Sequence, residues 1–279
     1  MDKNSTEAES TSIAENFANW ALDEATALPH TSNQIIARMT YDAVGLMYAA
    51  RNEDYILSVK ESAIEKGGCR AVGHKTKLVS YDSCLVNGTA IHGEDFDDTY
   101  EGTPVHLAAS LVPPMIALSS ICQIDRHDWV RSISLAAELI CRLVVVAPTA
   151  IHRQGFHPTG VLGAFGATAV AGVCLRLQPK QLASALGIVG SMTSGIIEYL
   201  AEGTWTKRMH PGWAAASGLK AALMARNGFL GPRTVFEGEH GFFKAFADPS
   251  IKQDLSVLDN WGGSWHFDQV AFKPFACGT

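Results

Sequence analysis

The sequence predicts an all-α fold, and three observations support this. The chain has 279 residues of which 47% are hydrophobic, enough for one large domain with its own core. Apolar residues recur at helical spacing in most segments, which predicts about ten helices. The chain has no strong strand–helix–strand pattern and no Gly-x-Gly-x-x-Gly loop. We therefore expect one helical domain over residues 11–279, after a disordered N-terminus at residues 1–10.

The first half of the chain predicts four helices. Thr11 or Ser12 can cap the first, which carries apolar residues on one face. The others are expected at residues 32–51, 54–66 and 81–91, with Gly67-Gly68 ending the third. Residues 69–72 are predicted to form a short extended piece.

The second half predicts further helices at residues 107–121, 129–146, 161–175, 181–194 and 213–226. Pro113 and Pro114 interrupt the first of these, so we expect a kink there or a helix that begins at Pro113. Glu138 and Arg142 are four residues apart on one helical face and can pair.

Two stretches of the second half are not predicted to be helical. Residues 198–207 are expected to form a polar loop, and residues 261–273 an extended segment.

Composition limits the possible partners and the compartment. The net charge of −6 and the pI near 5.9 argue against nucleic acid as a partner. No stretch approaches the ~18 uninterrupted apolar residues of a membrane span, so no membrane partner is expected. The N-terminus lacks the apolar core of a signal peptide. The six cysteines are widely spaced and mostly lie in apolar patterns, which indicates reduced core residues and a cytoplasmic protein.

The candidate functional residues centre on residues 92–106, which hold five carboxylates and two histidines. Like charges this close repel, and a fold tolerates them when they are solvated, bind a cation or act as acid and base. Asp97-Asp98-Thr99-Tyr100-Glu101 matches the loose magnesium motif of helical terpenoid synthases, but the chain shows no second metal motif. A His/Asp zinc site is also conceivable, without an HExxH or CxxC motif to support it. The third interpretation is proton transfer by a histidine that a carboxylate orients, and the rest of the chain favours it.

The residues that favour proton transfer are two histidines and three cations. His106 is expected at a helix start, where a neutral imidazole can act as a base while a carboxylate fixes its other nitrogen. His157 precedes a proline and a small-residue helix, a position that favours anions and lowers a histidine pKa. Lys207 and Arg208 lie in a compact cationic loop that can bind carboxylates. Lys273 lies between aromatic residues and needs an anionic partner if buried. No cofactor is required.

Four motifs in this order resemble the MmgE/PrpD family, and the similarity runs from about residue 12 to the end of the chain. The motifs are Asn87-Gly88-Thr89-Ala90-Ile91-His92 with Glu94-Asp95-Phe96-Asp97-Asp98-Thr99, then Gly155-Phe156-His157-Pro158-Thr159, Thr206-Lys207-Arg208-Met209-His210-Pro211-Gly212 and Phe272-Lys273-Pro274-Phe275. The family includes 2-methylcitrate dehydratase, cis-aconitate decarboxylase and iminodisuccinate epimerase. The resemblance implies metal-free chemistry at carbon next to a carboxylate.

The resemblance also implies a set of site residues. In the decarboxylase branch the pocket holds an Asp, a Thr, two His and two Lys, and the motifs place these at Asp95, Thr99, His106, His157, Lys207 and Lys273. Two departures bear on the substrate. The spacing from Asp95 to His106 is one residue longer than in the animal decarboxylase, and Tyr100-Glu101 replaces a Trp-His pair. The Gly-Thr-Pro-Val-His form is more similar to the bacterial epimerase-type branch.

The resemblance further implies a homodimer and a large helical domain followed by a smaller α/β domain, which this chain is expected to lack. A site closed by that domain should then be open, with apolar residues on the side of Thr279. We expect a cofactor-independent lyase acting on a small di- or tricarboxylate, with loss of water as in 2-methylcitrate dehydratase and with decarboxylation or epimerisation as alternatives. A magnesium-dependent terpenoid-synthase-like enzyme and a non-catalytic carboxylate-binding paralogue are alternatives from other classes.

Overall fold

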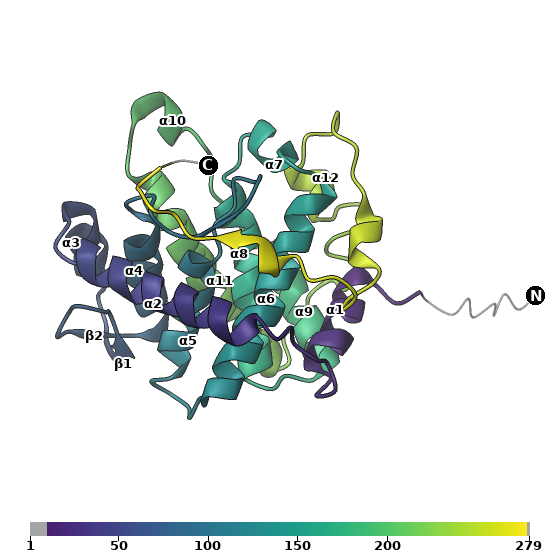
Figure 1. The fold of residues 1–279 in the computed structure, drawn as a ribbon, viewed down its shortest axis with the longest axis horizontal. Coiled ribbons are helices and arrows are strands. Elements are labelled where there is room, and N and C mark those ends of the chain that lie inside the picture. Colours follow the sequence, from purple (N-terminus) through teal and green to yellow (C-terminus); the bar gives the residue numbers. More distant parts are fainter. Residues whose placement is uncertain (1–9, 278–279) are drawn as a thin grey trace, which may run out of the picture.

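A computed structural model describes residues 10–277, so most of the predicted disordered N-terminus lies outside the described residues. Within this range the fold is mostly helical, as the sequence predicts, and Figure 1 shows helices on all sides of a central group. The α-helices are α1 (Ile13–Leu22), α2 (Ser32–Ala50), α3 (Asp54–Glu61), α4 (Ser80–His92), α5 (Ala108–Leu118), α6 (Arg126–Val146), α7 (Ala150–Arg153), α8 (Pro158–Cys174), α9 (Pro179–Gly190), α10 (Tyr199–Glu202), α11 (Thr206–Arg226) and α12 (Phe242–Phe246). Two 3₁₀ turns follow at Leu255–Leu258 and Phe267–Gln269.

The centre of the core is α8, which packs against α6, α11, α5 and α9. Its residues from Pro158 to Val173 are all buried, which explains why the sequence pattern there is small and apolar on every side. Helix α11 also packs closely on α4. A Cβ at Gly88 would lie 2.4 Å from the Cα of Gly212, so this crossing requires glycine on both helices. The contact brings the start of α11 beside the end of α4, where the acidic segment begins.

The N-terminal helices follow the sequence prediction, with one correction. Ser12 caps α1 through a capping box with Glu15. Helix α3 ends at Glu61 rather than at residue 66, because the chain from Lys66 turns into strand β1 (Lys66–Arg70). This strand pairs antiparallel with β2 (Lys77–Leu78). A Cβ at Gly67 would lie 2.3 Å from the carbonyl oxygen of Leu78, so this glycine serves strand pairing and not a helix end.

At two proline-containing segments the structure excludes one alternative of the sequence prediction and corrects a predicted loop. Helix α5 begins at Ala108 and continues through Pro113 and Pro114, so it does not start at Pro113. The predicted cationic loop is also helical, because α11 begins at Thr206 and includes Pro211. These prolines lie beyond the first four residues of their helices, so each removes an intrahelical hydrogen bond. All three are buried, and packing against the neighbouring helices offsets that loss. Lys207 and Arg208 are therefore held on a rigid first turn.

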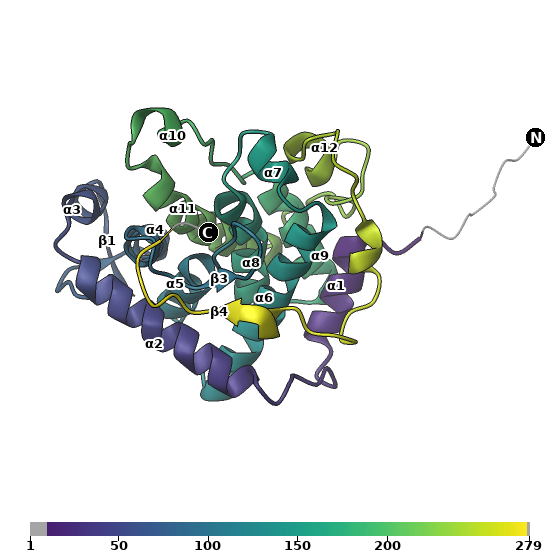
Figure 2. The same cartoon turned by 45° about the horizontal axis from the view of Figure 1, so that its top comes forward.

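The remaining differences lie at α9, α10 and the C-terminal segment. Helix α9 starts at Pro179, and it ends at Gly190, four residues before the predicted end at residue 194. The short helix α10 interrupts the predicted polar loop. Residues 261–273 are mostly irregular and contain only strand β4 (Val270–Ala271). This strand pairs antiparallel with β3 (Thr99–Tyr100), with Thr99 opposite Ala271, and Figure 2 shows the two strands side by side.

A buried ion pair anchors the C-terminal segment to α6. Glu138 and Arg142 pair at 2.6 Å as the sequence predicts. The second carboxylate oxygen of Glu138 accepts hydrogen bonds from the backbone N–H groups of His266, at 2.7 Å, and Phe267, at 3.2 Å. Arg142 donates to the carbonyl oxygens of Val257 and Ser264. The pair thus fixes the segment that carries Lys273.

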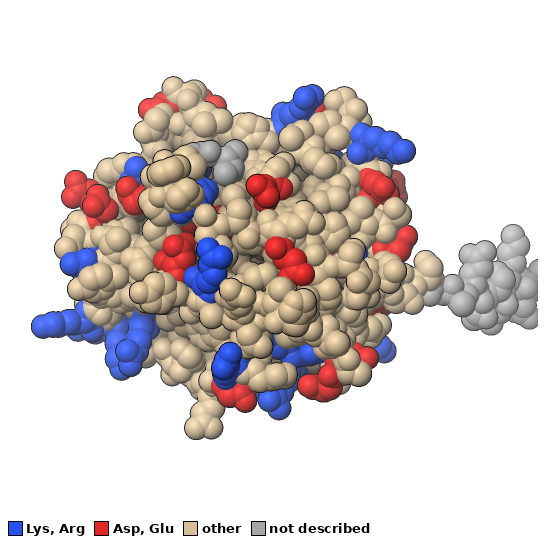
Figure 3. Space-filling model, viewed as in Figure 1, with Lys and Arg blue, Asp and Glu red and all other residues tan. Residues whose placement is uncertain are grey.

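The surface and the cysteines agree with the composition. None of the helices in the described range is long and apolar enough to cross a membrane. Cys69, Cys84 and Cys141 are buried free thiols, as predicted, whereas Cys122 and Cys277 are exposed. On the face shown in Figure 3, Lys and Arg side chains are interspersed with Asp and Glu.

Candidate active site

The structure brings the predicted lysines together at Asp95, although they are 66 residues apart in the chain. Lys207 forms an ion pair with the Asp95 carboxylate, and both side chains are partly buried. Lys273 donates to the Asp95 carbonyl oxygen over 3.0 Å and to the Cys277 carbonyl oxygen over 2.8 Å. The Cys277 N–H also donates to the Asp95 carbonyl oxygen. Asp95 has a φ of +53°, a left-handed conformation that is uncommon outside glycine and is found disproportionately at functional sites.

Beside these lysines lie four buried histidines in a row, His106, His92, His157 and His210. The ring centroids are 5.0 Å apart for His106 and His92, 5.3 Å for His92 and His157, and 5.3 Å for His157 and His210. In the same order, these histidines come from the loop before α5, the end of α4, the start of α8 and the start of α11. Each is at most 7% exposed. We call this row the histidine cluster.

Asp97 links the first two histidines and is fully buried. One carboxylate oxygen lies 2.8 Å from Nδ1 of His92 and the other lies 3.5 Å from Nδ1 of His106. Burial raises the pKa of Asp97, but the neighbouring His106 and His92 imidazoles outweigh it and lower the pKa to about 2. The carboxylate is therefore ionised, and it holds Nδ1 of His92 as a donor. Nε2 of His92 is buried and has no hydrogen-bond partner among the described residues.

His106 is held by a backbone carbonyl, which corrects the expectation that a carboxylate would fix it. Its Nδ1 lies 2.8 Å from the carbonyl oxygen of Asp98. Since a carbonyl only accepts, Nδ1 carries the proton and Nε2 has a free lone pair. Burial lowers the pKa of His106 to about 4, against the attraction of Asp97. His106 is thus a neutral imidazole with one nitrogen available as a base, as the sequence predicts.

Asp98 has a structural role that sequence reasoning did not assign. Its two carboxylate oxygens accept from the N–H groups of Leu107, at 3.1 Å, and Ala108, at 2.9 Å. These are orphan donors at the start of α5, so the residue caps that helix from a distance. Burial, followed by the charge of Asp97, raises the pKa of Asp98 to about 7. Asp97 and Asp98 are engaged with separate partners, whereas the terpenoid-synthase interpretation needs both on one magnesium ion.

His157 occupies the N-cap position of α8, as predicted for a helix start. Its Nδ1 lies 3.2 Å from Nδ1 of His210, and its backbone N–H donates to the carbonyl oxygen of Gly195 over 2.8 Å. Burial lowers the pKa of His157 well below its usual value, and the other histidines and Lys207 add to this effect. Burial also lowers the pKa of His210 to about 4. Both rings are therefore neutral near pH 7.

Thr99 and Arg208, the remaining predicted site residues, lie at the edge of the site. Thr99 is buried in strand β3, and its hydroxyl donates to the carbonyl oxygen of Val105 over 3.3 Å. Arg208 lies 3.6 Å from the carboxylate of Glu94 and stacks over the ring of Tyr55 at 4.3 Å. The Tyr55 hydroxyl donates to the same carboxylate over 2.8 Å. Arg208 therefore neutralises Glu94, the neighbour of Asp95.

Within residues 10–277, two groups of side chains have donor atoms close enough together to hold a metal ion. Those of His92, Asp95, Asp97 and His106 lie within 4.8 Å of one another, as do those of Asp125, His127 and Asp128. In the first group, however, Asp95 is paired with Lys207 and Asp97 with Nδ1 of His92. These contacts engage the Asp95 carboxylate and one oxygen of Asp97, whereas the other Asp97 oxygen is buried without a hydrogen-bond partner among the described residues. The second group is largely exposed and contains no predicted site residue.

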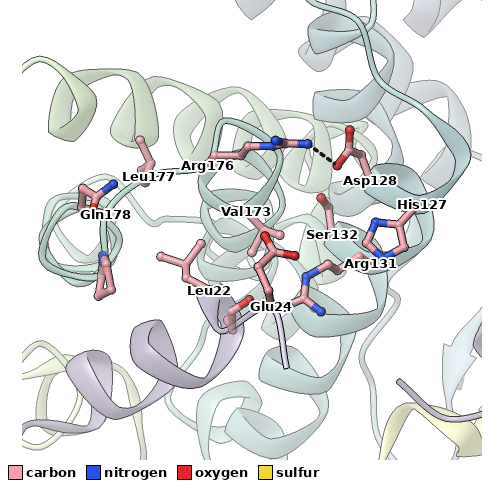
Figure 4. Close-up of a pocket in the computed structure, with 12 residues that line it drawn as sticks. Leu22, Glu24, His127, Asp128, Arg131, Ser132, Val173, Arg176, Leu177 and Gln178 are labelled. Carbon is pink, nitrogen blue, oxygen red and sulfur yellow. Dashed lines mark hydrogen bonds and ion pairs between the residues drawn. The ribbon is translucent and has the colours of Figure 1, made fainter. Parts of the chain in front are cut away.

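Cavities and exposed apolar residues border the site without enclosing it. A cavity of about 590 Å³ is lined by Gly102, Thr103, Pro104, Thr149 and His152, next to the loop that leads to His106. Ile196, Leu200 and Phe275 are 63%, 64% and 70% exposed. In the chain, Ile196 follows Gly195, which accepts from the His157 N–H, and Leu200 follows Tyr199, which packs on His157. Phe275 is two residues before Cys277, which accepts from Lys273. The cavity in Figure 4 is different, because it lies among Leu22, Arg131, Arg176 and their neighbours and contains none of the predicted site residues.

The site thus combines neutral imidazoles, an ionised carboxylate and two lysines inside a helical domain, which is a constellation for acid–base chemistry on an anion. Residues 15–254 match the MmgE/PrpD N-terminal domain, and the chain belongs to this family. A cis-aconitate decarboxylase from Homo sapiens is 33% identical over 200 residues, which cover 69% of this chain and 40% of that protein. A cis-aconitate decarboxylase from Aspergillus terreus is 27% identical, with 76% and 45% covered. A cis-aconitate decarboxylase-like protein from Aspergillus oryzae is also 27% identical, with 76% and 46% covered. The chain spans less than half the length of these relatives.

Sequence reasoning assigned no role to three residues that complete the site, namely His92, Asp97 and His210. All three are inside the quoted motifs, so the signal was present. His92 and Asp97 are five residues apart across a helix end, a spacing that does not predict contact by periodicity. His210 is three residues after Lys207, a spacing that brings two side chains onto one face of a helix. It was missed because this stretch was expected to be a loop.

Proposed function

We propose that this chain carries the acid–base site of a cofactor-independent lyase that acts on a small di- or tricarboxylate. The observation that carries the proposal is the histidine cluster next to two lysines that both contact Asp95. Neutral buried imidazoles can exchange protons near pH 7 only when a reacting group reaches them, and lysines beside them can hold the carboxylates of such a group.

The lysines are proposed to bind substrate carboxylates. Lys207 has Asp95 as its partner without substrate, so a substrate carboxylate would compete with the Asp95 carboxylate for the same ammonium group. Among the described residues, Lys273 donates hydrogen bonds only to backbone carbonyl oxygens, which leaves its charge free to pair with an anion. Arg208 is assigned a supporting part, because Glu94 already neutralises it.

The imidazoles are proposed to move the proton. In a decarboxylation an imidazole first acts as a base and takes a proton from solvent. The C–CO₂ bond then breaks, the electron pair stays on carbon, CO₂ leaves, and the imidazolium delivers its proton to that carbon. In a dehydration one imidazole removes a proton next to the carboxylate, and a second group protonates the departing hydroxyl. His106, with Nδ1 blocked by the Asp98 carbonyl and Nε2 free, is the candidate base in both cases. His157 is the candidate second group, and Thr99 and Asp95 help to position the substrate.

Among the three reactions of the family, decarboxylation is the one we place first. The relatives named above are cis-aconitate decarboxylases, which supports loss of CO₂ over the loss of water that the sequence motifs first suggested. A homodimer in the cytoplasm remains a prediction from the resemblance and from composition.

The test is to incubate the purified protein separately with cis-aconitate, 2-methylcitrate and iminodisuccinate and to identify products by ¹H and ¹³C NMR. Release of CO₂ from cis-aconitate is the expected result, and it should be unchanged by EDTA. Turnover that requires Mg²⁺ would support the terpenoid-synthase-like alternative. Binding of all three carboxylates without any product would support a non-catalytic binding paralogue.

A further inference from the structure

His210 makes a contact that the proposed roles leave unexplained. It lies on the first turns of α11, three residues after Lys207, so the two side chains share one face of the helix. Its Nδ1 is 3.2 Å from Nδ1 of His157. A distance of this length between two ring nitrogens fits a hydrogen bond, and such a bond needs one protonated and one unprotonated nitrogen.

The surroundings hold the His210 ring in this position. A Cβ at Gly195 would lie 3.0 Å from Nδ1 of His210, and a Cβ at Gly160 would lie 3.0 Å from its Cβ. Gly195 has a φ of +129°, which side-chain-bearing residues rarely adopt. The carbonyl of the same Gly195 accepts from the backbone N–H of His157. One loop therefore fixes both imidazoles, and the Tyr199 ring packs 6.0 Å from one and 5.8 Å from the other.

The charges around the pair favour two neutral rings. The titratable and charged groups nearby are His92, His106 and Lys207, and the Tyr199 ring packs against both imidazoles. Cationic forms of these neighbours repel a further positive charge, and within the described residues no carboxylate is hydrogen-bonded or ion-paired to either ring. A neutral–neutral pair that shares one Nδ1 proton is therefore the state of lowest electrostatic cost.

We propose that His210 is a positioning residue that sets the tautomer of His157: Nδ1–H of His157 donates to Nδ1 of His210, which leaves Nε2 of His157 free to exchange a proton with the substrate. The contact requires that one of the two Nδ1 atoms carries a proton. The assignment of that proton to His157 rests on the proposed function, which needs a free Nε2 on that ring. His210 carries its own proton on Nε2 in this arrangement. When Nε2 of His157 takes a proton, the hydrogen bond to His210 stabilises the resulting imidazolium without contacting substrate.

Three variants test the proposal, with His30, an exposed histidine, as the matched control. His210→Phe keeps a ring but removes the acceptor. His210→Asn offers a side-chain oxygen near the position of Nδ1. His30→Asn changes an imidazole away from the site. The tautomers are read by long-range ¹H–¹⁵N NMR of ¹⁵N-histidine-labelled protein, with signals assigned from the variants, and melting temperatures are measured in parallel.

The expected spectrum of the unaltered protein shows His157 protonated at Nδ1 and His210 protonated at Nε2. His157 should keep this form in His210→Asn and change to the Nε2–H form in His210→Phe. The proposal is overturned if His157 is already the Nε2–H tautomer in the unaltered protein, or if it keeps Nδ1–H in His210→Phe. These outcomes do not depend on turnover, so they decide the proposal even if no tested carboxylate is a substrate, which would refute the proposed function alone.

The kinetic consequence is that loss of His210 should change kcat but not KM. With cis-aconitate, His210→Phe should lower kcat by about 100-fold, since a mis-set general acid–base group typically loses a factor of this order, while KM changes little. His210→Asn should recover most of kcat, and His30→Asn should match the unaltered protein. Equal losses in His210→Phe and His210→Asn that follow the fall in melting temperature would show a purely structural role and overturn the proposal.

Discussion

Replacing Lys207 with alanine separates a binding role from a structural role. In the free protein Lys207 forms one ion pair, with Asp95, and the two side chains are 25% and 35% exposed. Ion pairs at this exposure contribute about 0–1 kcal/mol to stability, which is a change of a few degrees at most in the melting temperature of a domain this size. A charge-assisted hydrogen bond from Lys207 to a substrate carboxylate is instead worth about 1.5–3 kcal/mol. Its loss should weaken substrate binding by about 10- to 150-fold.

The assay compares Lys207→Ala with Lys220→Ala. Lys220 is an exposed lysine on the same helix, so the control removes an equal charge from α11 at a distance from the site. Binding is measured by calorimetry with cis-aconitate or by KM, and stability by thermal unfolding. The reasoning is refuted if the two variants bind the carboxylate equally well, because Lys207 would then be only a surface ion pair.

Three further predictions address the framework of the site. Lowering the pH from about 6.5 to about 4 should reduce the free energy of unfolding, because three histidines with lowered pKa values, His106, His157 and His210, bind protons in the unfolded chain but not in the folded one. Asp98, whose pKa is raised, opposes this by one proton, and the net difference of two protons gives about 3 kcal/mol per pH unit near pH 5. Urea unfolding measures this dependence, and a flat profile would contradict the assignment of neutral imidazoles. Glu138→Ala should destabilise the protein by about 3–5 kcal/mol, because it leaves Arg142 buried without its partner. Glu202→Ala, which changes an exposed glutamate, is the control and should leave stability nearly unchanged. A cost below about 1 kcal/mol for Glu138→Ala would argue that this ion pair does not anchor the C-terminal segment. Gly212→Ala should lower the melting temperature and the turnover together, since its methyl group would meet the Leu85 carbonyl oxygen at 2.3 Å, whereas Gly45→Ala, at an open position on α2, should lower neither.

The helical fold was predictable because its periodic apolar faces and caps are local features. Ser12, one of the two predicted caps, caps α1, and Glu138 pairs with Arg142 one helical turn away as predicted. The errors arose where tertiary packing overrode a local sequence rule. Pro113, Pro114 and Pro211 looked like helix breaks, yet they lie where the chain continues as helix because neighbouring helices bury it.

The site was predictable as a set of residues but not as a geometry. Motifs placed Asp95, His106, His157, Lys207 and Lys273 in one region, and the structure brings the lysines to Asp95 and the histidines into one row. Which atom orients each imidazole depended on contacts between distant segments. The Asp98 carbonyl on His106 and Nδ1 of His210 on His157 have no signature in spacing, since the partner of His157 is 53 residues away.

The central claim is that buried neutral imidazoles carry the proton in a reaction next to a substrate carboxylate. The most direct measurement is kcat/KM for cis-aconitate in His106→Gln compared with His127→Gln, an exposed histidine on α6. We expect His106→Gln to lose at least about 100-fold, the lower range for removal of a general acid or base, at an unchanged melting temperature, and His127→Gln to lose nothing. A His106→Gln variant with kcat/KM within about threefold of the unaltered protein, a difference of under about 1 kcal/mol in the barrier, would contradict the account.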